Sequence, residues 1–258
     1  MFRWLTERRR RHILDHPWPD SWDAIIDANV PMAAQLDDDE RARLRQLAQV
    51  FIAEKHWEGC GGLALTDEMK VTIAAQGCLL ILARDHDLFA RLVTILVYPS
   101  TVVSPPRAPR VWRSPYNIHE LGGTPVLGES SGDAVILAWD DVVRSARDPH
   151  DGRNLVLHEL AHAIDFADGR ADGTPPLESD AQRRTWAAVC TAAFRALEHA
   201  APAGDDPARA LRAYGATNEA EFFAVATEAF FERPHDLRAQ ESTLYALLRD
   251  FYRIDLAR

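Results

Sequence analysis

The chain has 258 residues, of which 47% are apolar and 26% are charged, a composition typical of globular proteins. Its formal net charge is −10, which argues against a nucleic-acid-binding surface as its main functional feature. No uninterrupted apolar run reaches the roughly 18 residues that a membrane-spanning helix needs. These properties predict a globular protein with no membrane span and no nucleic-acid partner.

The cysteines bear on the cellular compartment. Cys60, Cys78 and Cys190 are too few and too scattered for a disulfide framework, and free thiols fit a reducing compartment. The first residues are basic, but no apolar run of signal-peptide length follows them. We therefore expect a cytoplasmic protein.

Residues 1–36 are rich in tryptophan and proline and are expected to wrap the surface of the domain that follows. A helix is predicted over residues 37–56, where an acidic first turn precedes apolar residues that share one face. The glycine-rich stretch 59–62 interrupts the chain. Thr66 then has the character of an N-cap residue for a helix that continues to about Leu82.

The middle of the chain has the composition of β-strands. Strands are predicted within residues 92–103 and over residues 134–139, and loops over residues 105–115 and 122–132. The last hundred residues or so have helical patterns. The sequence therefore predicts one α+β domain over residues 37–258, with a small mixed sheet packed on helices.

Residues 158–162 read HELAH and form an HExxH motif. On a helix, His158 and His162 lie one turn apart on the same face, so that both imidazoles can reach one metal ion. Glu159 is rotated by about 100° from His158, too far to join them but close enough to contact a water molecule at the metal. The motif therefore predicts a zinc site with Glu159 as the general base.

The surroundings of the motif favour a buried helix. Asp151 or Asn154 can cap its start, Gly169 can end it, and apolar residues lie nearly all around it. Histidines inside such a helix need partners, and we expect that both share one metal ion. The alternative is that they are hydrogen-bonded core residues.

A hydrolytic zinc site needs a third protein ligand, and three carboxylates qualify. Asp168 stands ten residues after His158, where an extended HExxH motif has its third ligand. However, that motif requires a glycine where this chain has Asp165. The other two candidates are Glu221 and Glu228.

Glu221 and Glu228 lie seven residues apart on one face of a helix predicted to begin near Thr217 or Asn218 and to end before Pro234. Buried carboxylates are costly unless they are paired or bound to a metal. Structural roles are also open to them: Glu221 could complete a capping box with Asn218, and Glu228 could form an ion pair.

The stretch YGATNEAEFFA at 214–224 resembles a motif of the Mlc titration factor A family, which are glucose-regulated zinc peptidases. This part of the chain is also similar to the catalytic domain of lethal-factor-type toxin peptidases. The first resemblance covers most of residues 40–235, through EGCGGLALTDEM at 58–69, AAQGCLL at 74–80, YPS at 98–100, GES at 128–130, WDD at 139–141 and DGRNLV at 151–156.

The resemblance implies a zincin-like fold in which Glu221 is the third zinc ligand. It also implies that the Tyr214 hydroxyl supports the oxyanion, a role that fits the chemistry of a phenol beside a polarised carbonyl. Without the resemblance, Tyr214 could simply pack on its loop. Glu228 is then expected to hold a zinc ligand in position without contacting the metal itself. Asp165, one turn past His162, could hydrogen-bond a ligand histidine.

We therefore expect a zinc-dependent peptidase with a peptide or protein substrate. The resemblance further implies a regulatory role through binding a glucose-responsive transcriptional repressor. The alternative is a non-catalytic zinc-containing protein that sequesters such a repressor. Glu159 and Tyr214 argue against that alternative, because a structural zinc site needs neither.

Overall fold

A computed structural model of the chain describes residues 3–100 and 133–258. The loops predicted over residues 105–115 and 122–132 lie outside the described residues, as does the GES motif. The described elements are α1 (Arg3–Leu14), α2 (Asp20–Asn29), η1 (Pro31–Gln35), α3 (Asp38–Glu54), β1 (His56–Gly59), α4 (Asp67–Leu79), η2 (His86–Phe89), β2 (Thr94–Tyr98), β3 (Ala134–Ala138), α5 (Trp139–Ala146), α6 (Leu155–Asp165), η3 (Phe166–Asp168), α7 (Asp180–Ala200), η4 (Ala201–Ala203), η5 (Ala213–Ala216), α8 (Glu219–Glu232), α9 (Pro234–Gln240) and α10 (Ser242–Tyr252).

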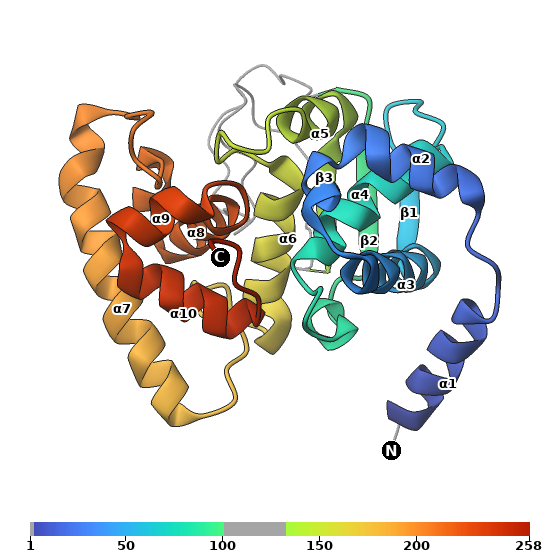
Figure 1. Ribbon diagram of the computed structural model, residues 1–258, viewed down its shortest axis with the longest axis horizontal. Coiled ribbons are helices and arrows are strands. Elements are labelled where there is room, and N and C mark those ends of the chain that lie inside the picture. Colours follow the sequence, from blue (N-terminus) through green and yellow to red (C-terminus); the bar gives the residue numbers. More distant parts are fainter. Residues whose placement is uncertain (1–2, 101–132) are drawn as a thin grey trace, which may run out of the picture.

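Helix α6 lies in the middle of the molecule (Figure 1). The sheet and the helices α1 to α4 are on one side of it, and the helices α7 to α10 are on the other. Helix α6 contacts α4 and β3 on the first side and α8 on the second. Residues of the HExxH motif therefore lie where the two halves of the chain meet.

The sheet is small and parallel. Its described strands have the order β1-β2-β3, and both pairs run parallel, with Trp57 beside Ile95 and Ile95 beside Val135. The mixed sheet that we predicted is thus wrong for the described strands. Helix α4 connects β1 to β2, and a helical crossover of this kind joins parallel neighbours.

Local sequence signals account for the helices next to the sheet. The side chain of Asp37 accepts a hydrogen bond from Glu40 N–H, and the Glu40 side chain accepts one from Asp37 N–H, so α3 begins with a capping box. Thr66 caps α4 by accepting from Met69 N–H, as predicted. Strand β1 was not predicted, because HWEG is too short and too polar to show an apolar pattern.

Close packing fixes α6 against α4. Gly77 of α4 lies so near to α6 that a Cβ atom on it would come within 2.1 Å of Leu160 Cδ1. Leu160, Ala161 and Ile164 are fully buried. The helix is buried nearly all round, as its apolar sequence predicts, and this burial holds the histidines in a defined position.

The N-terminal residues form α1, α2 and η1. Helix α1 packs on α3, and α2 packs on α4. The division of the chain at residue 36 stays a prediction.

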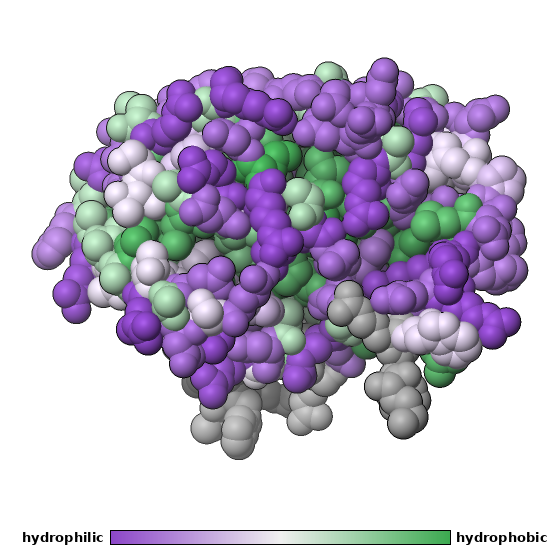
Figure 2. All heavy atoms as spheres, turned by 60° about the horizontal axis from the view of Figure 1, so that its bottom comes forward, coloured by the Kyte–Doolittle hydropathy of each residue, from purple (hydrophilic) through white to green (hydrophobic). Residues whose placement is uncertain are grey.

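The apolar side chains are mostly enclosed. Hydrophilic residues cover much of the face shown in Figure 2, and hydrophobic residues appear between them. The large apolar side chains that are exposed among the described residues are Trp4, Leu5, Leu14 and Val93. No helix within the described ranges is long and apolar enough to cross a membrane.

Candidate metal centre

The two histidines of the HExxH motif are presented by α6. Asn154 is its N-cap residue, with Oδ1 accepting a hydrogen bond from Leu157 N–H at 3.1 Å. The rings of His158 and His162 lie one turn apart, with their centroids separated by 4.9 Å. The helix ends through η3 at Gly169, whose φ of +96° is suited to a glycine.

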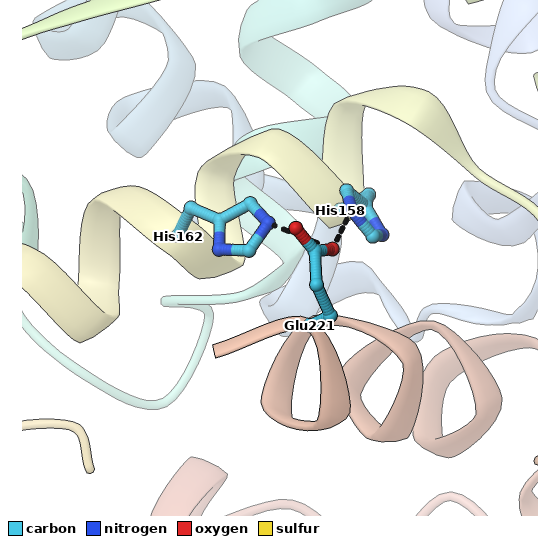
Figure 3. Close-up of side chains that lie close together, drawn as sticks. All are labelled: His158, His162 and Glu221. Carbon is cyan, nitrogen blue, oxygen red and sulfur yellow. Dashed lines mark hydrogen bonds and ion pairs between the residues drawn. The ribbon is translucent and has the colours of Figure 1, made fainter. Parts of the chain in front are cut away.

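The third member of the cluster comes from α8. Asn218 caps this helix by accepting from Glu221 N–H at 2.9 Å. The side chain of Glu221 turns toward α6, and its Oε2 lies 3.1 Å from His158 Nε2 and 3.4 Å from His162 Nε2 (Figure 3). The donor atoms of all three residues lie within 4.8 Å of one another.

This donor set fits a divalent metal ion. Two imidazoles and one carboxylate are ligands that zinc accepts in sites that keep a position open. The electrostatics agree: although burial acts against a charged imidazole, Glu228 and Glu221 together raise the pKa of His158 to about 10. Burial likewise opposes a charged Glu221, yet the two histidines hold the pKa of its carboxyl well below the usual range. The cluster therefore favours a positive charge at its centre.

Glu228 contacts the other ring nitrogen of His158. Its Oε2 lies 3.0 Å from His158 Nδ1, and its Oε1 accepts a hydrogen bond from Asn154 N–H at 2.8 Å. Glu228 is therefore tied both to the ring of His158 and to the start of α6.

Glu159 and Asp165 are both buried carboxylates on α6. Burial raises the pKa of Glu159 above the ordinary value, while the nearby His158 and His162 act in the opposite direction. Burial also raises the pKa of Asp165 to about 6. Its Oδ2 accepts a hydrogen bond from Gly173 N–H at 2.9 Å, which ties the end of α6 to the following loop. The predicted contact between Asp165 and a ligand histidine stays a prediction.

Tyr214 lies in η5, just before α8. Its ring is half-buried, and its centroid lies 6.0 Å from that of His158. Tyr214 thus approaches the ring of His158 from a third element. The role of its hydroxyl in supporting an oxyanion stays a prediction.

Asp168 does not join the cluster. It is exposed in η3, and its Oδ1 accepts a hydrogen bond from Arg170 N–H at 3.0 Å. Asp165 is the last residue of α6, at the position where the extended motif has a glycine, and Asp168 follows in η3.

Arg212 was missed by the sequence interpretation. Its Nη2 donates a hydrogen bond to Glu228 Oε2, and its Nε donates to the carbonyl oxygen of Gly152 at 3.1 Å. One signal could have pointed to it: a carboxylate as buried as Glu228 needs a cation, and Arg212 stands two residues before Tyr214.

Comparison with known proteins places the chain in a family. The profile of the family described as glucose-regulated metallo-peptidase M90 matches residues 4–253. An uncharacterized protein of Synechocystis sp. is 34% identical over 96% of this chain and 89% of that protein. Mlc titration factor A of Edwardsiella ictaluri is 31% identical over 93% of this chain and 88% of that protein. Mlc titration factor A of Pectobacterium atrosepticum is 30% identical over 98% and 91%.

The donor set is of the kind found in metal-dependent hydrolases. The chain belongs to the glucose-regulated metallo-peptidase M90 family. The resemblance to the Mlc titration factor A family is thereby confirmed, whereas the similarity to toxin peptidases stays a prediction; the match also includes most of residues 1–36, for which the motifs gave no correspondence. Membership in this family implies a metal ion.

Proposed function

We propose that the chain is a zinc-dependent peptidase of zincin type. The observation that carries the proposal is the His158, His162 and Glu221 cluster, whose donor atoms lie within 4.8 Å of one another inside an HExxH helix and its neighbour. These three residues would hold the ion. When bound, zinc supplies a Lewis acid that polarises a carbonyl oxygen and lowers the pKa of water.

Glu159 is the general base in this proposal. It follows His158 directly, so its carboxylate points about 100° away from the ligand direction. From there it accepts the proton of the water molecule that attacks the peptide carbonyl. Burial raises its pKa, which brings a carboxylate closer to the range in which it both takes up and releases a proton.

Tyr214 is the proposed oxyanion donor. Its ring packs near His158, and its hydroxyl would donate a hydrogen bond to the carbonyl oxygen as negative charge develops. Glu228 orients His158 by accepting from Nδ1, and Asp165 supports the C-terminal end of α6.

The regulatory part of the proposal concerns a protein partner. Several relatives bear the name Mlc titration factor A. We infer that this chain binds a glucose-responsive transcriptional repressor as well. A cytoplasmic location is part of the same proposal, and the free state of Cys60, Cys78 and Cys190 supports it.

Metal content and peptide cleavage, measured together, test the catalytic proposal. Wild type and Glu159→Gln are purified, assayed for bound zinc, and incubated with a peptide library. Both should bind one zinc ion per chain, and the variant should lose most cleavage. Near wild-type cleavage by Glu159→Gln would overturn the assigned base, and zinc without any cleavage by wild type would favour the non-catalytic alternative.

The partner proposal needs a separate measurement. Gel filtration of the chain with a purified Mlc repressor should show a complex, and Glu159→Gln should form it equally well, because binding does not need the base. Separate elution of the two proteins at concentrations well above micromolar would contradict it.

A further inference from the structure

Arg212 lies where three parts of the metal centre meet. It directly precedes η5, the short helix that carries Tyr214. Its side chain contacts Glu228 on α8 and the carbonyl oxygen of Gly152, two residues before the N-cap of α6. One residue therefore connects the start of α6, the middle of α8 and the turn of Tyr214.

The contact with Glu228 extends to His158. The same carboxylate oxygen that accepts from Arg212 lies 3.0 Å from His158 Nδ1. Glu228 is almost fully buried, and a buried carboxylate is retained only where cations and donors compensate for its lost hydration. Without the guanidinium, Glu228 would lose one of these partners and its fixed position beside His158.

The shape of the guanidinium matters as well as its charge. Nε donates to Gly152 in the loop before α6, and Nη2 donates to Glu228 on α8. A planar guanidinium can hold both at fixed angles, whereas a lysine ammonium is a single point charge on a flexible stem. The Arg212 side chain is only 13% exposed, so little of this arrangement is open to solvent.

We propose that Arg212 is the positioning residue of this centre. Through Glu228 it orients the His158 ring for the metal ion. Its hydrogen bond to Gly152 fixes Arg212 beside the start of α6. Because Arg212 directly precedes η5, this bond also holds the turn of Tyr214 at the correct distance from the His158 ring. The Tyr214 part rests on the proposed function, whereas the His158 part concerns metal binding alone.

The His158 part is tested by zinc affinity, which needs no peptidase activity. Competition with a chromogenic chelator gives the affinity of wild type, Arg212→Ala, Arg212→Lys, Glu228→Ala and the Arg212→Ala/Glu228→Ala double variant. Arg212→Ala should weaken zinc binding by about 10- to 100-fold, the range for losses next to a ligand. Arg212→Lys should recover only part of this loss. The double variant should bind within about twofold of Glu228→Ala, because both substitutions interrupt one path.

Arg233 provides a matched control. Its side chain is 14% exposed, and it also joins a backbone carbonyl, that of Arg209, to a carboxylate, that of Asp236. It lies near Gly152, but neither of these two partners belongs to the metal cluster. Arg233→Ala should therefore leave the zinc affinity within about twofold of wild type. Thermal unfolding of each variant verifies that it folds. If Arg212→Ala does not fold, Arg212→Lys replaces it in the zinc measurements.

The Tyr214 part is tested by kcat in the Glu228→Ala background. Adding Arg212→Ala at saturating zinc should lower kcat further, because the turn of Tyr214 is released. Two results on zinc affinity would overturn the proposal. One is a loss in the double variant equal to the product of the two single-variant losses, and the other is a loss in Arg233→Ala as large as that in Arg212→Ala. If wild type cleaves no peptide, the proposed function fails, and the zinc measurements still decide whether Arg212 acts through Glu228.

Discussion

Glu221 and Glu228 contact opposite nitrogens of one imidazole. Glu221 Oε2 lies 3.1 Å from His158 Nε2, and Glu228 Oε2 lies 3.0 Å from His158 Nδ1. The two carboxylates are seven residues apart, which is about two helical turns, and so they share one face of α8. A neutral imidazole has one N–H and one lone pair. With a metal ion bound, the Nδ1–H of a neutral His158 would donate to Glu228, and the lone pair of Nε2 would be left for the ion.

This relationship separates the carboxylates in a metal-retention experiment. Glu221→Ala should abolish zinc binding or weaken it severely, because it removes a direct donor. Glu228→Ala should cost about 10- to 100-fold in affinity, because the ligand remains but its orientation is lost. Asp168→Ala should retain full zinc, since Asp168 is exposed and its carboxylate accepts a hydrogen bond from Arg170 N–H. Metal analysis after mild chelator dialysis measures all three, and full zinc in Glu221→Ala would refute the ligand set.

Tyr214 should act on the rate and not on binding. Tyr214→Phe keeps the ring that packs near His158 and removes only the hydroxyl. A hydrogen bond that forms mainly in the transition state should lower kcat by about 100-fold or more when it is lost, with little change in KM. Steady-state kinetics on one peptide decide the matter, with zinc content as the control. An unchanged kcat would leave Tyr214 with a packing role.

The sequence predicted the local features of the site well. Asn154 and Asn218 are short polar residues before helical patterns, and each caps its helix. The ends of α6 and α8 follow from these caps and from Gly169 and Pro234. Such signals depend on neighbours in the chain, so composition and spacing are sufficient to find them.

The contacts between distant residues needed the structure. His158 and Glu221 are 63 residues apart in the chain, and geometry within either helix could not choose Glu221 over Glu228. That choice came from the family resemblance. Arg212 was missed for the same reason, because its partners Gly152 and Glu228 are 60 and 16 residues away in the chain. The parallel sheet was also missed, because β1 is short and its pairing depends on the crossover.

Gly173 should be intolerant of a side chain. Its φ is +74°, and a Cβ atom would lie 2.3 Å from the carbonyl oxygen of Glu219, the first residue of α8. Gly173→Ala should lose about 1–2 kcal/mol from the left-handed backbone and about 1–3 kcal/mol more from the clash. Because Glu221 lies only two residues after Glu219, the zinc affinity of the Gly173→Ala variant should fall as well.

Gly62→Ala is the matched control for Gly173. Its φ is +83°, but nothing lies within 4 Å of the added Cβ. It should therefore show only the backbone cost of about 1–2 kcal/mol and keep its zinc affinity. Chemical denaturation gives both free energies of unfolding. Equal losses in the two variants would mean that the loop at Gly173 moves away from α8 without cost.

Acid should destabilise the fold through His86 in η2. Burial, together with the charges of Arg10, Lys55 and Arg43, lowers the pKa of His86 from 6.5 to about 3. Between these values the unfolded chain binds a proton that the folded chain does not, so stability is present above pH 6.5 and falls as the pH decreases. From pH 7 to pH 5.5 this one group should remove about 1 kcal/mol from the free energy of unfolding. Urea denaturation at several pH values in this range measures the slope, and His86→Gln should flatten it, because glutamine does not titrate. A slope unchanged by His86→Gln would mean that His86 takes up its proton without unfolding.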